Sequence, residues 1–177
     1  MKSDIVLQPG QARYKIQVMK KIIWILAAAL MLGGCQPQAA TTTFTTAGFS
    51  ITLPSSFSVQ TAPGYAAGYA DDDVIVLVST TTRAQLSQRG LDGDMTIDDY
   101  AGLLVSSFDV GSYTAFRKSG FDYFTYTAYV LDDYFYYTVA VYATAEAFWS
   151  VSFSCLFDVR AAYKDKMVSW ARTVSVD

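Results

Sequence analysis

The sequence predicts an α+β domain built on an antiparallel sheet of about six strands with flanking helices. Three observations predict it. Several stretches alternate apolar and polar residues with the period of two that is typical of half-buried strands. Two other stretches place apolar residues at helical spacing. The predicted strands follow one another in runs instead of alternating with helices, which favours an antiparallel sheet.

The first predicted elements are short strands. Phe49-Ser-Ile-Thr-Leu53 alternates cleanly and ends at Pro54, so it predicts a half-buried strand. Residues 54–72 are rich in Pro, Gly, Ser, Ala and Tyr, which predicts a short second strand with loops. Val74–Val78 is an unbroken apolar, mostly β-branched run. Such a run predicts a strand that is covered on both faces.

Two helices are predicted next. Residues 83–89 predict a short helix that ends at Gly90, and a loop follows over 91–95. Thr96-Ile-Asp-Asp99 resembles a capping box in which Asp replaces the usual Glu. Apolar side chains then recur at helical spacing, which predicts a helix over 97–107.

Most of the sheet is predicted after Gly111. Residues 113–118, 121–130 and 134–144 predict three strands. The turn Leu131-Asp132-Asp133 joins the last two as an antiparallel hairpin.

The remaining elements close the domain. Residues 148–157 place apolar side chains at odd positions and serines at several even positions, which predicts a strand with one buried face. Asp158 is expected to cap a helix over 159–172. Val174 and Val176 predict a last short strand.

Three packing motifs resemble those of a known fold. They are Phe49-x-Ile-x-Leu-Pro54, Trp149-x-Val-x-Phe153 and Lys166-Met-x-x-Trp170 with a trailing Val-x-Val. Together with the order of elements, they resemble the PsbP-like α/β/α sandwich, which includes many bacterial lipoproteins of DcrB type. The resemblance covers roughly residues 48–177. It implies a non-catalytic assembly or binding module, and it transfers no site residue.

A secretory signal is predicted before the domain. Lys20 and Lys21 precede an unbroken apolar run over 22–32, and two glycines and a cysteine follow. The run is shorter than the roughly 20 apolar residues that a transmembrane helix needs. A buried core helix and an uncleaved anchor helix are the alternatives. The first lacks the expected polar face, and Cys35 at the end of the run argues against the second.

Leu32-Gly33-Gly34-Cys35 also resembles the bacterial lipobox. That resemblance implies that a diacylglycerol is attached to the Cys35 thiol and that the chain is cut just before it. We therefore expect a signal peptide over 19–34, a lipidated tether over 35–47 and a single globular domain over 48–177. Residues 1–18 match no part of a signal, so we interpret them as an extension that results from an over-long gene assignment.

Charge and composition exclude several function classes. Cleavage leaves 8 of the 13 basic and 15 of the 16 acidic residues, a net charge of −7. This is the wrong sign for binding nucleic acid. The sequence contains no histidine, the most usual general base and transition-metal ligand. With Cys35 lipidated, Cys155 has no disulfide partner and is expected to be a small buried residue. We expect no cofactor.

Acidic groups are the first candidates for chemistry. Asp92, Asp94, Asp98 and Asp99 could hold Ca²⁺, but their spacing does not match an EF-hand. Helix-dipole and turn roles explain these residues more simply. Adjacent carboxylates such as Asp132-Asp133 could act on a sugar, but in a hairpin turn they would diverge into solvent.

Tyrosine and threonine rows on the 121–142 hairpin are the second candidate. A sheet face of this kind could bind a protein or a glycan, because tyrosine offers rigid amphipathic contact area. The alternative is that a flanking helix covers the face. The residues proposed for this interaction surface are Tyr123, Thr125, Tyr129, Tyr134, Tyr136 and Tyr142.

Taken together, these features predict a lipoprotein of the bacterial cell envelope, anchored on the extracytoplasmic side of a membrane. Its expected role is that of a non-catalytic binding or assembly module. Two other functions stay open. An Asp-dependent glycan-processing enzyme would need two carboxylates facing one another in a cleft. A small-ligand binding lipoprotein would need a concave apolar pocket near the Tyr rows.

Overall fold

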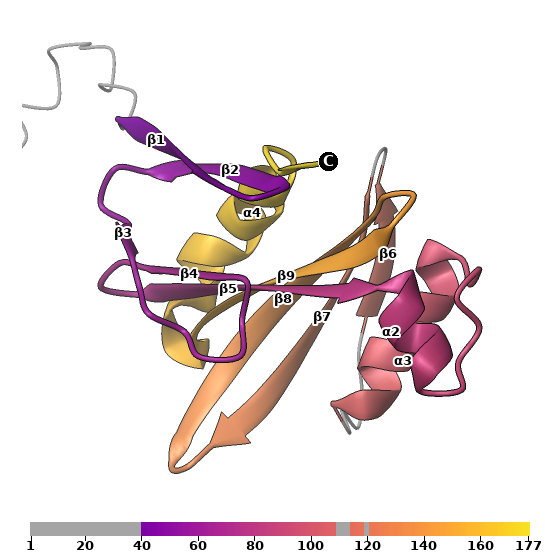
Figure 1. Ribbon diagram of the computed structural model, residues 1–177. Helices are drawn as coiled ribbons and strands as arrows, with labels where there is room; N and C mark the ends of the chain where they lie inside the picture. The colour runs from indigo at the N-terminus through magenta and orange to yellow at the C-terminus, as the bar shows by residue number, and fades with distance from the viewer. Residues whose placement is uncertain (1–39, 109–113, 119–120) are drawn as a thin grey trace, which may run out of the picture. The chain divides into compact units, whose positions relative to one another are not determined.

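The computed structural model describes residues 40–108, 114–118 and 121–177. The predicted extension, the signal and Cys35 lie outside these residues. The described elements follow in chain order (Figure 1). They are β1 Thr41–Thr46, β2 Phe49–Pro54, β3 Ser58–Val59, β4 Ala67–Ala70, β5 Val74–Thr82, α2 Arg83–Gln88, α3 Ile97–Ser107, β6 Thr114–Lys118, β7 Phe121–Val130, β8 Asp133–Ala143, β9 Ala147–Leu156, the 3₁₀ turn η1 Phe157–Val159, α4 Arg160–Ala171 and β10 Ser175–Val176.

The predicted fold class is confirmed. Seven strands form an antiparallel sheet in the order β3-β4-β5-β9-β8-β7-β6. The count exceeds the predicted six because the two-residue β3 pairs with β4 at one edge. β2 is not part of this sheet, since it pairs with β1 and β10 in a second, three-stranded sheet.

The expected tether over 35–47 is too long. Residues 41–46 form β1, which pairs along its whole length with β2. Phe44 packs against Tyr69 with 4.8 Å between ring centroids, so this threonine-rich stretch carries an apolar side chain that the domain buries in part. The turn to β2 contains Gly48 at φ +71°, where a Cβ atom would lie 3.4 Å from the Trp149 ring. The compact unit accordingly includes β1, which precedes residue 48.

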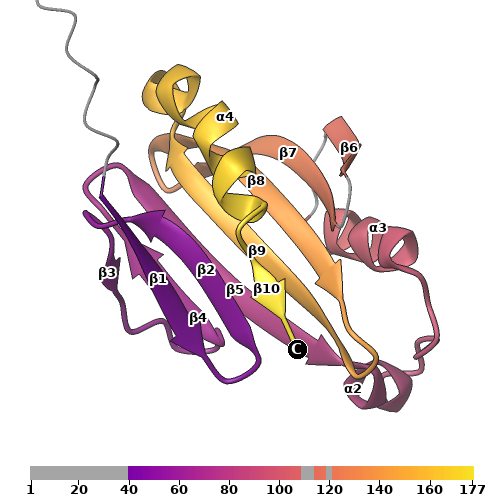
Figure 2. The ribbon, with the colours of Figure 1, turned by 90° about the horizontal axis from the view of Figure 1, so that it is seen from above.

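One face of the large sheet is covered over most of its area, apart from the end of the β7–β8 hairpin. The three-stranded sheet and α4 lie over it, as the view from above shows (Figure 2). The apolar side chains of β5 and β9 point into this core, and Met167, Trp170 and Ala171 of α4 meet them. The predicted inward face of β9 is therefore confirmed.

The opposite face is covered at one end only. There α2 and α3 bury Leu86 and Tyr100 against Phe124, Val141 and Phe148. Val74–Val78 was predicted to be covered on both faces, and this is wrong. β5 alternates, and Ile75 on the open face is 45% exposed. An apolar run alone cannot reveal which side of a strand a helix reaches.

Two of the helices begin with a capping box, and Thr82 with Gln85 forms the one at the start of α2. Thr96 and Asp99 form the predicted capping box at the start of α3. Asp158 does not cap α4, because it lies inside η1 and no side-chain hydrogen bond caps that helix. Among the described residues, no helix is long and apolar enough to cross a membrane.

Candidate functional site

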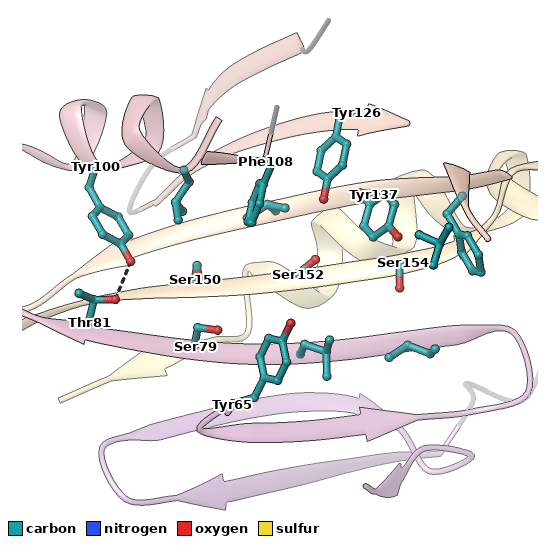
Figure 3. Close-up of a pocket in the computed structure, with 16 residues that line it drawn as sticks. Tyr65, Ser79, Thr81, Tyr100, Phe108, Tyr126, Tyr137, Ser150, Ser152 and Ser154 are labelled. Atoms are coloured by element: carbon teal, nitrogen blue, oxygen red, sulfur yellow. Dashed lines mark hydrogen bonds between the residues drawn. The ribbon is translucent and has the colours of Figure 1, made fainter. Parts of the chain in front are cut away.

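A groove of about 530 Å³ lies on the open face of the seven-stranded sheet (Figure 3). Its size falls within the roughly 300–1,000 Å³ that is typical of small-ligand sites. Strands β5, β7, β8 and β9 form it, together with α3 and the loop before β4. The side chains that line it are those of Tyr65, Ile75, Leu77, Ser79, Thr81, Tyr100, Leu104, Phe108, Tyr126, Val130, Phe135, Tyr137, Val139, Ser150, Ser152 and Ser154.

The floor of the groove consists of small side chains from β9. Ser150, Ser152 and Ser154 occupy alternate positions and therefore share one face of the sheet. Larger residues stand beside Ser152 and Ser154 on both neighbouring strands, whereas Ser150 lies beside Ser79 of β5. Ser152, for example, lies opposite Leu77 of β5 and Val139 of β8. A strip of serines between taller side chains makes a trough along β9.

A stack of aromatic rings forms one wall. The Tyr126 and Tyr137 rings lie 4.6 Å apart and almost parallel, and Phe108 extends the stack at 6.0 Å from Tyr126. Burial raises the pKa of Tyr126 to about 12, and burial likewise raises the pKa of Tyr137. Both hydroxyls therefore stay protonated at neutral pH, so they can donate hydrogen bonds to a ligand.

The other wall and the end of the groove come from different segments. Ile75 and Leu77 stand on β5, and Figure 3 shows Tyr65 reaching toward the serine row from the same side. Tyr100 of α3 closes one end, where its hydroxyl donates to Thr81 Oγ1 at 3.1 Å. The opposite end, near Val130 and Ile75, is open because these side chains are about half exposed.

The side chains that line the groove are uncharged at pH 7. Within the described residues, the hydroxyls of Ser150, Ser152 and Ser154 make no hydrogen bond. The groove thus offers aromatic and aliphatic walls with a few hydroxyl groups at the floor. This combination suits an uncharged ligand with a mainly apolar body.

The predicted interaction surface lies on the other face of the sheet, and α4 covers much of it. Tyr142 is buried, and its hydroxyl donates to the Ala171 carbonyl at 2.6 Å. Tyr123 is buried in the same core, and Tyr136 packs against it. Tyr123 and Tyr142 therefore do not lie on a bare surface, and Tyr136 is partly buried, so the alternative of a covering helix applies to these three tyrosines. The sequence signal was ambiguous because both rows of this hairpin contain aromatics.

Three predicted residues lie farther along the hairpin. Thr125 is half-buried in β7. Tyr129 is the most exposed of the set, and its ring stacks on that of Tyr134 at 4.5 Å. Tyr134 also donates its hydroxyl hydrogen bond to Thr127 Oγ1 at 2.7 Å. The hairpin end is thus the only part of the predicted surface with a strongly exposed aromatic side chain.

The other candidate residues have local structural roles. Asp99 accepts hydrogen bonds from the Thr96 hydroxyl and backbone, which lower the pKa of its carboxyl group. Asp92 accepts from the Asp94 backbone in a turn. Among the described residues, no group of three or more His, Cys, Asp or Glu side chains could hold a metal. Cys155 is buried, as expected, and burial with the nearby Asp73 charge raises its thiol pKa to about 11.

Sequence reasoning did not identify the groove. The alternating serines of β9 were visible in the sequence as the polar side of a half-buried strand. Nothing in the sequence showed that β5 and β8 would flank them with taller side chains. That depends on strand order, since β5 pairs with β9 although residues 83–146, 64 in all, separate the two strands in sequence.

The fold and the groove together define an α+β domain whose seven-stranded sheet is open on part of one face. No family profile and no curated protein matches the chain. The chain does match several solved structures. The chain is similar to the solution structure of cyanobacterial PsbP (CyanoP) from Synechocystis sp. PCC 6803. The identity is 15% and the TM-score 0.52, over 82% of this chain and 99% of that chain.

Two further structures are similar. A crystal structure from Bacteroides thetaiotaomicron VPI-5482 shares 14% identity with a TM-score of 0.53 over 79% of this chain. This chain spans about half of that one, since 49% of it is covered. LpqN, described as involved in cell envelope biogenesis of Mycobacterium tuberculosis, shares 11% identity with a TM-score of 0.46, over 77% and 90% of the two chains. Identities this low show the fold alone, and the CyanoP similarity confirms the PsbP-like fold.

Proposed function

We propose that this protein is a lipid-anchored, extracytoplasmic, non-catalytic binding module whose groove holds an uncharged, mainly apolar small molecule. The observation that carries the proposal is the serine-floored groove on the open face of the sheet. Its volume, its aromatic wall and its free hydroxyl groups are all features of ligand sites.

The anchoring part of the proposal rests on the sequence. Cys35 follows a basic and then apolar leader and completes a lipobox-like tetrapeptide. Each buried CH₂ of an acyl chain contributes about 0.8 kcal/mol to membrane binding, so two or more chains give lasting attachment. β1 begins only six residues after Cys35, so the anchored domain would stand close to the lipid headgroups.

The non-catalytic part rests on the chemistry of the groove. Acid–base catalysis at neutral pH needs a group that titrates near that pH. The groove side chains that can titrate are tyrosines, and burial raises the pKa of Tyr126 to about 12. Binding through shape and hydrogen bonds needs no such group.

The anchor is tested by changing Cys35→Ala in the full-length chain and separating membrane from soluble fractions. The unchanged protein should sediment with membranes, and the variant should move to the soluble fraction. Membrane association that persists in the variant would contradict anchoring through this thiol.

The groove is tested with the neutral fluorescent probe N-phenyl-1-naphthylamine. Ser152→Phe should fill the trough between Leu77 and Val139 and weaken probe binding by about tenfold or more. Ser50→Phe is the matched control, because Ser50 is a half-buried strand residue of the other sheet. Ser154→Phe, nearer the open end, provides a second variant should Ser152→Phe not fold. Equal probe affinity in the groove variants and the control would refute this site.

A further inference from the structure

The hairpin tip between β7 and β8 exposes large apolar side chains. We define it as residues 129–133. Tyr129 is 73% exposed, Val130 46% and Leu131 95%. Tyr129 and Val130 point to opposite faces at the end of the ten-residue β7, and Leu131 follows them in the turn. The three side chains therefore surround the end of the hairpin, whose backbone projects from the domain in Figure 1. Burying such side chains in a partner is favourable, because it removes apolar surface from water.

Leu131 has an unfavourable backbone conformation for its side chain. Its φ of +55° is the single positive value among the described non-glycine residues. Two-residue hairpin turns favour Gly, Asn or Asp at such positions, because a Cβ atom makes the left-handed conformation costly. At 95% exposure, contacts within the domain do not offset this cost. Asparagine at this position would therefore be expected to stabilise the fold more than leucine does.

The tip is nevertheless held firmly. The Tyr129 ring stacks on Tyr134, and Tyr134 packs on Phe157 with 4.6 Å between centroids. The Arg160 guanidinium lies 3.6 Å above the Phe157 ring and donates to the Phe157 carbonyl at 3.0 Å. These stacked side chains connect the end of the hairpin with the start of α4. A preorganised apolar tip loses less conformational entropy when it binds.

The charges around the tip indicate the chemistry of its partner. Asp132 and Asp133 are both exposed beside Leu131, and neither forms an ion pair within the described part of the chain. Two uncompensated carboxylates are repelled by an anionic lipid surface. They are attracted by lysine or arginine side chains, and a complementary charge pattern steers and orients a protein partner.

We propose that the hairpin tip docks into an apolar pocket on a partner protein whose rim is basic. Leu131 fills the pocket as the anchor, Tyr129 and Val130 enlarge the apolar contact, and Asp132 and Asp133 pair with the rim. A small, central, rigid apolar anchor with a polar surround is the usual arrangement of an interaction hot spot. The interaction uses residues outside the groove except Val130, so it does not require a ligand there.

The first experiment locates the partner in cells that carry the full-length protein. The photo-crosslinking residue p-benzoylphenylalanine replaces Tyr129 in one strain. In a control strain it replaces Val59, which is 72% exposed on β3. We expect an adduct with one protein from position 129 that position 59 does not give, and its loss when Leu131→Asn is added. Asparagine tolerates positive φ, so this change should not unfold the hairpin.

The second experiment measures the interaction with the purified partner that mass spectrometry identifies. Leu131→Asn should weaken binding at least tenfold without lowering the melting temperature. The double change Asp132→Asn and Asp133→Asn should weaken binding and reduce its dependence on salt, because ion pairs at a rim are screened. Binding that is unaffected by Leu131→Asn, or whose salt dependence persists in the double variant, would overturn the proposal.

Other occupants give distinct results, and each overturns the proposal. A second copy would give an adduct of twice the chain mass. A membrane would give adducts with lipid, and the protein would sediment with phosphatidylglycerol vesicles through the tip even when Cys35 is changed to Ala. No adduct above the Val59 control would show that the tip has no partner.

Discussion

Replacing Ser152 with valine should stabilise the domain and weaken its groove at the same time. Ser152 is half-buried at the centre of β9, between Leu77 and Val139 on the same face of the sheet. Valine replaces a hydroxyl that makes no hydrogen bond within the described residues by two methyl groups. The new methyl groups would contact apolar side chains on both neighbouring strands.

The size of the stabilisation can be estimated from how deeply the new valine side chain would be buried. Full burial of a valine side chain is worth roughly 1.5–3 kcal/mol, and a half-buried position realises about half of it. The β propensity of valine acts in the same direction. Loss of the serine's hydration offsets part of the gain, so a net stabilisation of about 1 kcal/mol is expected. For a domain of this size, that raises the melting temperature by roughly 3–5 °C.

Thermal and urea unfolding, followed by circular dichroism, measure this change. Ser50→Val in β2 is the control, since Ser50 is also half-buried but pairs with Thr45 and Ser175 in the other sheet. The control should leave the affinity for N-phenyl-1-naphthylamine unchanged, whereas Ser152→Val should lower it. If Ser152→Val lowered the free energy of unfolding by about 1 kcal/mol or more, the reasoning would be refuted, because the Ser152 hydroxyl would then contribute to the stability of the fold.

Three further predictions test the other residues. Tyr142→Phe should destabilise the domain by about 1 kcal/mol in urea unfolding, because it removes the hydrogen bond to the Ala171 carbonyl; an unchanged midpoint would contradict the structural role. The Cys155 thiol, whose pKa burial raises to about 11, should react with iodoacetamide at pH 8 only after the protein is unfolded, and fast labelling of the native state would argue against its burial. Hydrogen bonds from Thr96 lower the pKa of Asp99 in the folded state, so their stabilising effect is present above the unfolded pKa and is lost as the pH falls through the folded one. The stability difference between the unchanged protein and Asp99→Asn should therefore shrink below about pH 4, and a difference that is constant from pH 7 to 3 would disprove the assignment.

Local sequence patterns predicted most elements of this fold. The alternation in 148–157, the capping box before α3 and the turn between β7 and β8 all act over a few residues, so they can be read without knowing the rest of the chain. The errors occur where contact with a segment distant in the sequence determines the local structure. β1 was interpreted as tether because its threonines have no periodicity, yet pairing with β2 and the contact of Phe44 with Tyr69 order it.

The candidate site was predicted only in part. A pocket near tyrosine rows was foreseen as the requirement for a ligand-binding protein, but the row that lines it contains Tyr126 and Tyr137. The predicted row contains Tyr123 and Tyr142, which α4 buries. Both rows look alike in sequence because each combines aromatics with small polar or β-branched residues.

The α+β class, most of the strand and helix segments, the acidic charge and the absence of histidine chemistry could all be predicted without a structure. These properties depend on composition and on spacing within single elements. Three-dimensional packing was needed to show which sheet face stays open, that Ser152 and Ser154 of β9 lie between taller side chains of β5 and β8, and that Leu131 projects into solvent. These properties depend on strand order and on where α3 and α4 pack, and the free energy of that packing comes from residues far apart in the chain.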